Sequence, residues 1–67
     1  IVLYVSSLSP DDIMASLYDV NGKLLVSKGY GVTDQVSDMI PVSIAPGVYF
    51  LRVSIGGQMY SVKLLKI

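Results

Sequence analysis

The chain has 67 residues, 52% of them hydrophobic, and its five basic and five acidic residues cancel to a net charge of zero. This balance argues against nucleic acid or an anionic membrane surface as partner. The absence of cysteine and histidine excludes disulfides, a conventional zinc site and the common nucleophile–base pairs of hydrolases. We therefore expect one small domain (residues 1–67) that depends on its apolar core and has no enzymatic activity and no cofactor.

No apolar run approaches the roughly 20 residues of a transmembrane helix, so direct membrane insertion is not expected. The chain starts at Ile1 rather than at methionine, inside a segment with strand character. We therefore expect it to be a fragment of a larger protein, with a further domain on its N-terminal side.

The first two segments predict a strand and then an ambiguity. Ile1–Val5 is β-branched and aromatic, which favours a short strand, and Ser6–Ser9 is expected to end it. At the start of Pro10–Tyr18, the sequence Ser9-Pro10-Asp11-Asp12 is typical of a helix start. The apolar residues at positions 13, 15 and 17 alternate instead, which favours a strand. The residues alone leave both alternatives open.

A turn follows at Asp19–Gly22, and two geometries satisfy it. Either Asn21 and Gly22 form a two-residue type I′ loop, or Asp19 opens a type I turn that Gly22 closes. Leu24–Val26 is predicted to be the returning strand.

The middle of the chain gives weaker signals. Gly29–Asp38 is polar and contains glycine, so we expect a loop or a ragged edge strand. Met39–Ile44 is predicted to be a further short strand, and Pro41 places that strand at a sheet edge or at its own end. Pro46 and Gly47 then predict the centre of a type II turn.

The C-terminal segment carries the strongest pattern. Between Val48 and Ile55 the odd positions are apolar, which predicts a half-buried strand. Gly56 and Gly57 are expected to supply the positive φ angles of a two-residue hairpin loop. This loop predicts the pairs Ile55–Gln58, Val53–Tyr60, Leu51–Val62 and Tyr49–Leu64. One hairpin face is then apolar, and the other carries Arg52, Ser54, Ser61 and Lys63.

The polar and aromatic residues offer little chemistry. Asp11 and Asp12 fit a solvated turn better than an acid–base pair, and together with Asp34 and Asp38 they do not match the ligand spacing of a calcium loop. The five tyrosines fit a small core better than a stacking platform. Tyr30, between two glycines, is the tyrosine that we expect to be exposed and to contact a partner.

Two stretches in this order resemble the C-terminal sorting domains of the type IX secretion system. The first is Leu17–Leu24, an aromatic-Asp-x-x-Gly-basic turn. The second is Ile44–Val53, with the sequence I-A-P-G-V-Y-F-L-R-V, which is followed after a Gly-Gly turn by the lysine-containing strand Tyr60–Ile67. The resemblance covers about residues 13 to 67. The Pro-Asn-Pro segment that often opens such domains is absent.

Six short strands with turns between them predict an all-β fold, a small antiparallel sandwich. The resemblance implies that this sandwich is immunoglobulin-like, with about seven strands in the intact family domain. The difference of one strand, and the absent Pro-Asn-Pro segment, fit a chain that lacks the first strand. The resemblance also implies that Pro10–Tyr18 is a strand. A missing strand would expose a sheet edge, through which the chain could associate with itself.

The resemblance further implies a non-enzymatic secretion and sorting signal of Bacteroidetes-type bacteria. Such a signal directs a cargo protein through the periplasm and across the outer membrane to the cell surface, and translocon and sortase components recognise it. The hypothetical recognition residues are Arg52, Lys63, Lys66 and Ile67, and the turn and motif residues are Asp19, Gly22, Pro46, Gly47, Tyr49, Gly56 and Gly57. The lysines could instead protect the last strand from edge-to-edge association. The alternative function is an accessory β-sandwich module, carbohydrate-binding or a spacer, of a secreted enzyme or adhesin.

Overall fold

The computed structural model describes all 67 residues and consists of four antiparallel strands in a single sheet. The strands are β1 (Val2–Asp19), β2 (Leu24–Met39), β3 (Gly47–Ile55) and β4 (Gln58–Lys66). Their order in the sheet is β2-β1-β3-β4, so that β2 and β4 are the edges. The structure contains no helix that could span a membrane. The all-β class expected from the sequence is confirmed.

The ambiguous segment Pro10–Tyr18 lies within β1, in the centre of the sheet. Ile13, Ala15 and Leu17 are 0%, 2% and 1% exposed, so the alternating residues bury one face of the strand. Leu17, for example, is opposite Val26 of β2 and Leu51 of β3. Pairing on both sides outweighs the local helix-start signature, because it satisfies the backbone and buries the apolar residues together.

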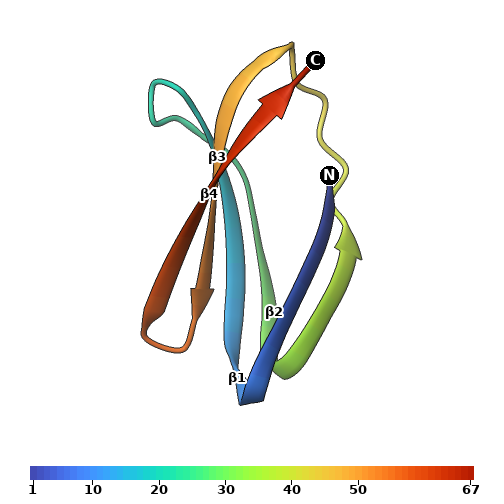
Figure 1. Ribbon diagram of the computed structural model, residues 1–67, viewed down its shortest axis with the longest axis vertical. Coiled ribbons are helices and arrows are strands. Elements are labelled where there is room, and N and C mark those ends of the chain that lie inside the picture. The colour runs from blue at the N-terminus through green and yellow to red at the C-terminus, as the bar shows by residue number, and fades with distance from the viewer.

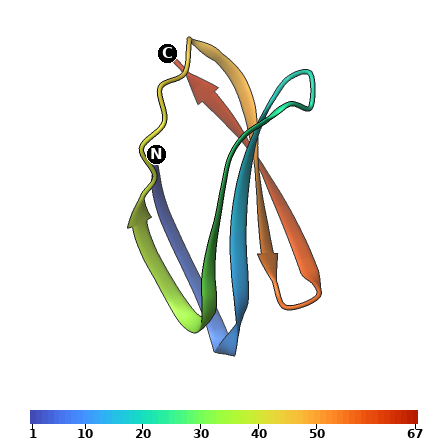
Figure 2. The same ribbon diagram turned by 180° about the vertical axis from the view of Figure 1, so that it is seen from behind.

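The hairpin formed by β1 and β2 is bent into a V (Figures 1 and 2). Its register shifts between Ser6 and Asp11, where the chain turns sharply. Before the bend, Val2–Ser6 pairs with Gln35–Met39; we call this pair of segments the arm. After the bend, Asp11–Asp19 of β1 pairs with Leu24–Thr33 of β2 and with β3, which in turn pairs with β4. We call these four segments the main sheet. The arm leans back over the main sheet, and the core lies between them.

The strand count differs from the sequence prediction. Four strands in one sheet are present instead of six to seven in a sandwich, because Ser6–Ser9 is a bend within β1 and not an end. Gly29–Asp38 belongs to the edge strand β2, as one of its two alternatives predicted. Tyr30 is an extra residue there, since Ile13 pairs with Gly31 and Met14 with Gly29. Such a bulge bends an edge strand without ending it.

The predicted strand Met39–Ile44 is wrong beyond its first residue. Ile40 exchanges backbone hydrogen bonds with Ile1, with N–O distances of 2.7 and 3.2 Å, and its side chain is buried. From there to Pro46 the chain joins no ladder and crosses from the arm to β3. Pro41 has no N–H to donate, which suits this connection.

The core contains nine buried residues, drawn from both parts of the V. The arm and the following connection contribute Leu3, Val36 and Ile40. The main sheet contributes Ile13, Ala15, Leu17, Tyr49, Leu51 and Val53. Strand β4 contributes none of them, although Leu64 packs against the cluster.

Two parts of β2 are joined across the bend by a polar cluster of Lys28, Tyr30 and Asp38. The Asp38 carboxylate accepts hydrogen bonds from Lys28 Nζ at 2.6 Å and from the Tyr30 hydroxyl at 2.9 Å. The hydrogen bond from Lys28, followed by that from Tyr30, lowers the pKa of Asp38. Burial and the neighbouring carboxylate raise the pKa of Tyr30 to about 12. Tyr30 is half-buried in this contact, so the prediction of an exposed Tyr30 is wrong.

Candidate functional site

The hairpin of β3 and β4 has the register that the sequence predicted. Ile55 is opposite Gln58, Val53 opposite Tyr60, Leu51 opposite Val62, and Tyr49 opposite Leu64. Of the two turn glycines only Gly56 has a positive φ, +60°, as a type II′ turn requires at its first central position. A Cβ at Gly56 would also overlap the Asp11 carboxylate, whereas nothing lies near Gly57. The requirement for glycine therefore falls on Gly56 alone.

The inner face of this hairpin is only partly covered. Tyr49, Leu51 and Val53 of β3 are all less than 10% exposed. Their partners Tyr60 and Val62 on β4 are 52% and 49% exposed, although they lie on the same face. The apolar face predicted for the hairpin is thus present, but the arm covers β3 and leaves β4 half open.

The outer face of the main sheet carries two cations beside aromatic rings. One cross-strand row contains Tyr18, Phe50 and Lys63, and the next contains Ser16, Arg52 and Ser61. The Arg52 guanidinium lies 5.4 Å from the centroid of the Tyr18 ring, within the range of a cation–π interaction. These two rows contain no carboxylate.

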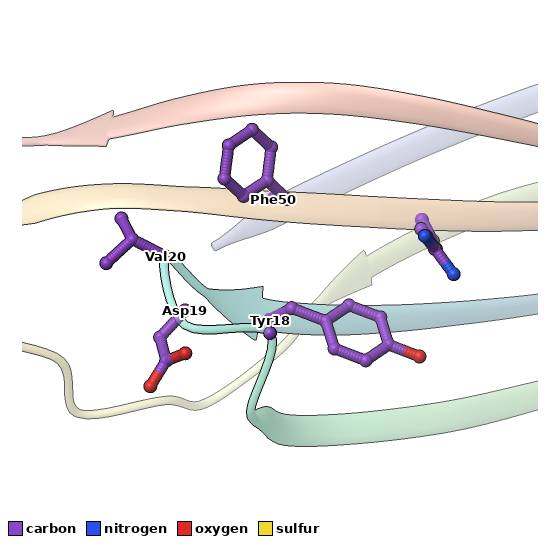
Figure 3. A pocket seen from close by; sticks show the side chains of 6 residues that line it. Tyr18, Asp19, Val20 and Phe50 are labelled. Carbon is purple, nitrogen blue, oxygen red and sulfur yellow. The ribbon is translucent and has the colours of Figure 1, made fainter.

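A shallow hollow of about 240 Å³ lies at the end of this outer face (Figure 3). It is lined by Tyr18, Asp19, Val20, Gly22, Phe50 and Arg52, so it holds one cation and one carboxylate. Phe50 is 39% exposed and offers an apolar group there. Lys63, opposite Phe50 on the same face but outside the hollow, is the cation that no carboxylate of the hollow offsets. The outer face can therefore bind a ligand surface through an aromatic contact in the hollow and through attraction of negative charge beside it.

The rim of the hollow is the turn that begins at Asp19. Its carboxylate accepts hydrogen bonds from the backbone N–H groups of Asn21 and Lys23, each at 2.9 Å. Its carbonyl accepts one from the Gly22 N–H at 3.1 Å. Because Asn21 has no positive φ, the type I′ alternative is excluded, and Asp19 opens a type I turn closed by Gly22 at φ +83°. Both bonds from the side chain fall on Oδ1, so the turn holds the Asp19 side chain in place through one of its two carboxylate oxygens.

The corner at Pro46 and Gly47 is held by Tyr49. The Tyr49 hydroxyl donates a hydrogen bond to the carbonyl of Ala45 at 2.5 Å, and the ring is 9% exposed. The predicted type II turn is wrong, because Gly47 has φ +156° and not the value near +80° that such a turn needs. A tyrosine hydroxyl bonded to the backbone just upstream is the arrangement of the tyrosine corner in immunoglobulin-like folds.

The comparisons with known proteins identify a family. A family model described as the secretion system C-terminal sorting domain matches residues 2–67. The chain belongs to this family. Its members are sorting signals for type IX secretion, generally without catalytic activity, and the signal implies export to the cell surface or into the medium. No curated protein and no solved structure matches the chain.

The structure of this sorting domain separates the four candidate recognition residues. Arg52 and Lys63 share the outer face. Lys66 is opposite Gly47, on the inner side, where it borders a hollow beside Ile1. Ile67 follows the end of β4 and is 97% exposed. Recognition through one contiguous surface can therefore use Arg52 and Lys63, but not all four residues.

Sequence reasoning did not select Tyr18 and Phe50 of the sorting domain as site residues. The alternation that placed Tyr49 and Leu51 in the core was sufficient to place Phe50 beside Arg52 on the other face. The same alternation could not place Tyr18, since its position next to Arg52 depends on the pairing of β1 with β3. No periodicity within either segment predicts that pairing.

Proposed function

We propose that this domain is a folded, non-enzymatic export handle. It is joined to the C-terminal side of a cargo protein and directs that protein through the periplasm and across the outer membrane. Translocon and sortase components of the type IX system bind it there. The family match over residues 2–67 is the observation that carries this proposal.

The machinery binds the domain at its C-terminal hairpin in two ways. Strand β4 is an edge of the sheet, so its outward N–H and C=O groups are free for the addition of a further strand. The neighbouring outer face is positively charged and partly aromatic, because it carries Arg52, Lys63 and the exposed ring of Phe50. Backbone pairing then supplies affinity, while the cations select an acidic partner surface.

The cation–π contact supports this role for Arg52. Stacking on Tyr18 limits the number of conformations that the long Arg52 side chain adopts before binding. Less conformational entropy is then lost when a partner binds. Lys63 has no salt-bridge partner, so it is available either for recognition or for protection of the edge.

An immunoglobulin-like classification is part of the proposal. The arm packs over the main sheet around one core, as the two layers of a sandwich do. The Tyr49 corner is a second feature of such folds. The alternative function, a carbohydrate-binding or spacer module, has weaker support, because Arg52 covers the Tyr18 ring and leaves no broad aromatic platform.

The test is surface display of a fusion. The domain is joined to a periplasmic reporter in a bacterium that has the type IX apparatus, and the displayed fraction is measured with and without substitutions. We expect the unaltered fusion to be displayed, and we expect Arg52→Ala combined with Lys63→Ala to retain it in the periplasm. Exposed substitutions of this kind change the free energy of unfolding by about 0.5 kcal/mol or less each, so the variant should melt normally.

Lys66→Ala is the matched control, since Lys66 is an exposed lysine of the same strand on the opposite face. A larger loss of display from Lys66→Ala than from the outer-face pair would contradict the proposed surface. Full display of the outer-face variant would limit its cations to edge protection. If the unaltered fusion is not displayed, the export function itself is overturned.

A further inference from the structure

An apolar groove lies on the inner side of the molecule, between the arm and the C-terminal hairpin. It has a volume of about 280 Å³. The arm contributes Leu3 and Val5 to its wall, and the hairpin contributes Val53, Tyr60 and Val62. No charged residue lines the groove. It is on the opposite face of the sheet from Arg52 and Lys63.

One wall of this groove is an unpaired strand edge. From Ile13 to Asp19, β1 is flanked by β2 on one side and β3 on the other. Along Val2–Ser6 it pairs with β2 alone. The second edge of this segment therefore has no partner on the side where β3 and β4 lie. Its N–H and C=O groups are available for another strand.

The floor of the groove is the uncovered part of β4. Tyr60 and Val62 lie on the core side but remain half exposed, whereas Leu51 and Val53 of β3 are buried in one cluster with Leu3 of the arm. A strand laid against the free edge of Val2–Ser6 would continue the arm over these two residues. The same ligand would thus complete the hydrogen bonding of one wall and cover the apolar floor.

We infer that this groove binds an extended, uncharged apolar strand of another polypeptide, paired with Val2–Ser6 and packed on Tyr60 and Val62. A charged strand would bury its charge without a partner, since no lining residue is charged. A small apolar molecule would leave the strand edge unpaired. The site is distinct from the outer face and its occupation does not depend on the proposed export function.

A second copy of the chain is the other occupant that the free edge of Val2–Ser6 admits, and the test below distinguishes it from a separate strand.

The test is an NMR titration of the 67-residue chain, labelled with ¹⁵N. The probe is a blocked peptide of alternating threonine and valine, seven residues long in this design, matched to the apolar period of a strand. We expect saturable shifts and slower amide exchange in Val2–Ser6. Val62→Lys should weaken binding by about tenfold or more, equivalent to about 1.4 kcal/mol. Leu65→Lys, on the outer face of the same strand, should change it by less than about twofold.

A second peptide, N-methylated at alternate residues, tests the backbone pairing and should not bind. The proposal is overturned by an absence of saturable shifts, by equal binding of the methylated peptide, or by equal losses from Val62→Lys and Leu65→Lys. It is also overturned if sedimentation shows a dimer that the peptide dissociates, since a second copy then fills the groove. Tyr60→Thr replaces Val62→Lys if that variant does not retain its circular dichroism spectrum.

Discussion

The register and shape of the two hairpins in this sheet are determined in different ways. In the C-terminal hairpin, a two-residue turn and a regular alternation of apolar residues specify the same register, and the structure has that register. In the hairpin of β1 and β2, pairing continues over longer strands with shifts in register, and the strands bend into a V. Local pattern is sufficient for the first hairpin. The second takes its shape from the core that its two parts form together.

The largest expected effect is at the residue where the two hairpins meet. Leu17 is 1% exposed and is flanked by Val26 and Leu51. Leu17→Ala should lower the free energy of unfolding by about 2–5 kcal/mol, because it leaves a cavity in a nine-residue core. Urea denaturation followed by circular dichroism measures this. Val62→Ala is the control, and an equal loss there would show that the C-terminal hairpin carries as much of the core.

Changing the turn glycines tests whether the C-terminal hairpin depends on its local geometry. Gly56→Ala should cost about 1 kcal/mol or more, because alanine must adopt φ near +60°. The Asp11 carboxylate that its Cβ would meet is the end of an exposed side chain and can move aside. Gly57→Ala requires no positive φ and should be close to neutral. Melting temperatures of the two variants provide the comparison. Equal losses would mean that the strand pattern, and not the turn, sets the register.

The corner at Pro46 provides a smaller effect. Tyr49→Phe removes the hydrogen bond to the Ala45 carbonyl and leaves the ring in the core. The expected loss is about 1 kcal/mol, the usual contribution of one such bond. Tyr60→Phe removes a hydroxyl from a half-exposed ring and should have little effect on chemical denaturation. A neutral Tyr49→Phe would show that the corner is held by packing alone.

The polar cluster on β2 predicts the smallest effect, a pH dependence. The pKa of Asp38 is lowered in the folded state, so its contribution to stability is present above the ordinary aspartate range and is lost as pH falls through the folded pKa. The advantage of the wild type over Asp38→Asn should therefore decrease below about pH 4. The pKa of Tyr30 is raised to about 12, so its contribution is complete below about pH 10 and is lost as pH rises toward 12.

Melting temperatures measured across both pH ranges test this prediction, with Tyr30→Phe as the variant for the alkaline range. An unchanged difference between wild type and Asp38→Asn in acid would show that the exposed Lys28–Asp38 pair is held too loosely to contribute. Since the Asp38 and Lys28 side chains are 24% and 45% exposed, the effect should also diminish in high salt.

What the sequence predicts follows the same division. Register, strand identity and the two faces of the C-terminal hairpin depend on neighbours two residues apart and on a short loop, so they can be derived from the chain alone. The half exposure of Tyr60 and Val62 cannot, because it depends on how far the arm reaches across β3. The predicted exposure of Tyr30 is wrong for a similar reason. Its flanking glycines indicate an exposed loop, while its partner Asp38 is brought close only by the bend.

For the candidate site, the sequence predicts which residues are cationic and which of them share a strand face, but not which aromatic ring lies beside them. Arg52 and Lys63 fall on one face by alternation, as the structure confirms. Lys66 has the opposite parity to Lys63, and the same register argument would have separated the two lysines. The contact between Arg52 and Tyr18 depends on strand order, which follows from the packing of the whole chain.

The two ends of the chain lie in the same half of the molecule, the C-terminus at its top and the N-terminus lower beside the end of β2 (Figures 1 and 2). The first residues are paired only with the end of β2, and the last only with the start of β3. A pull applied between the two ends therefore loads these hydrogen bonds one after another, like a zipper, and does not shear a whole ladder at once. We therefore expect little mechanical resistance along this axis, although nine buried side chains stabilise the fold in the absence of force. Single-molecule stretching from the two ends should open it at lower force than stretching from Gly22 and Gly57.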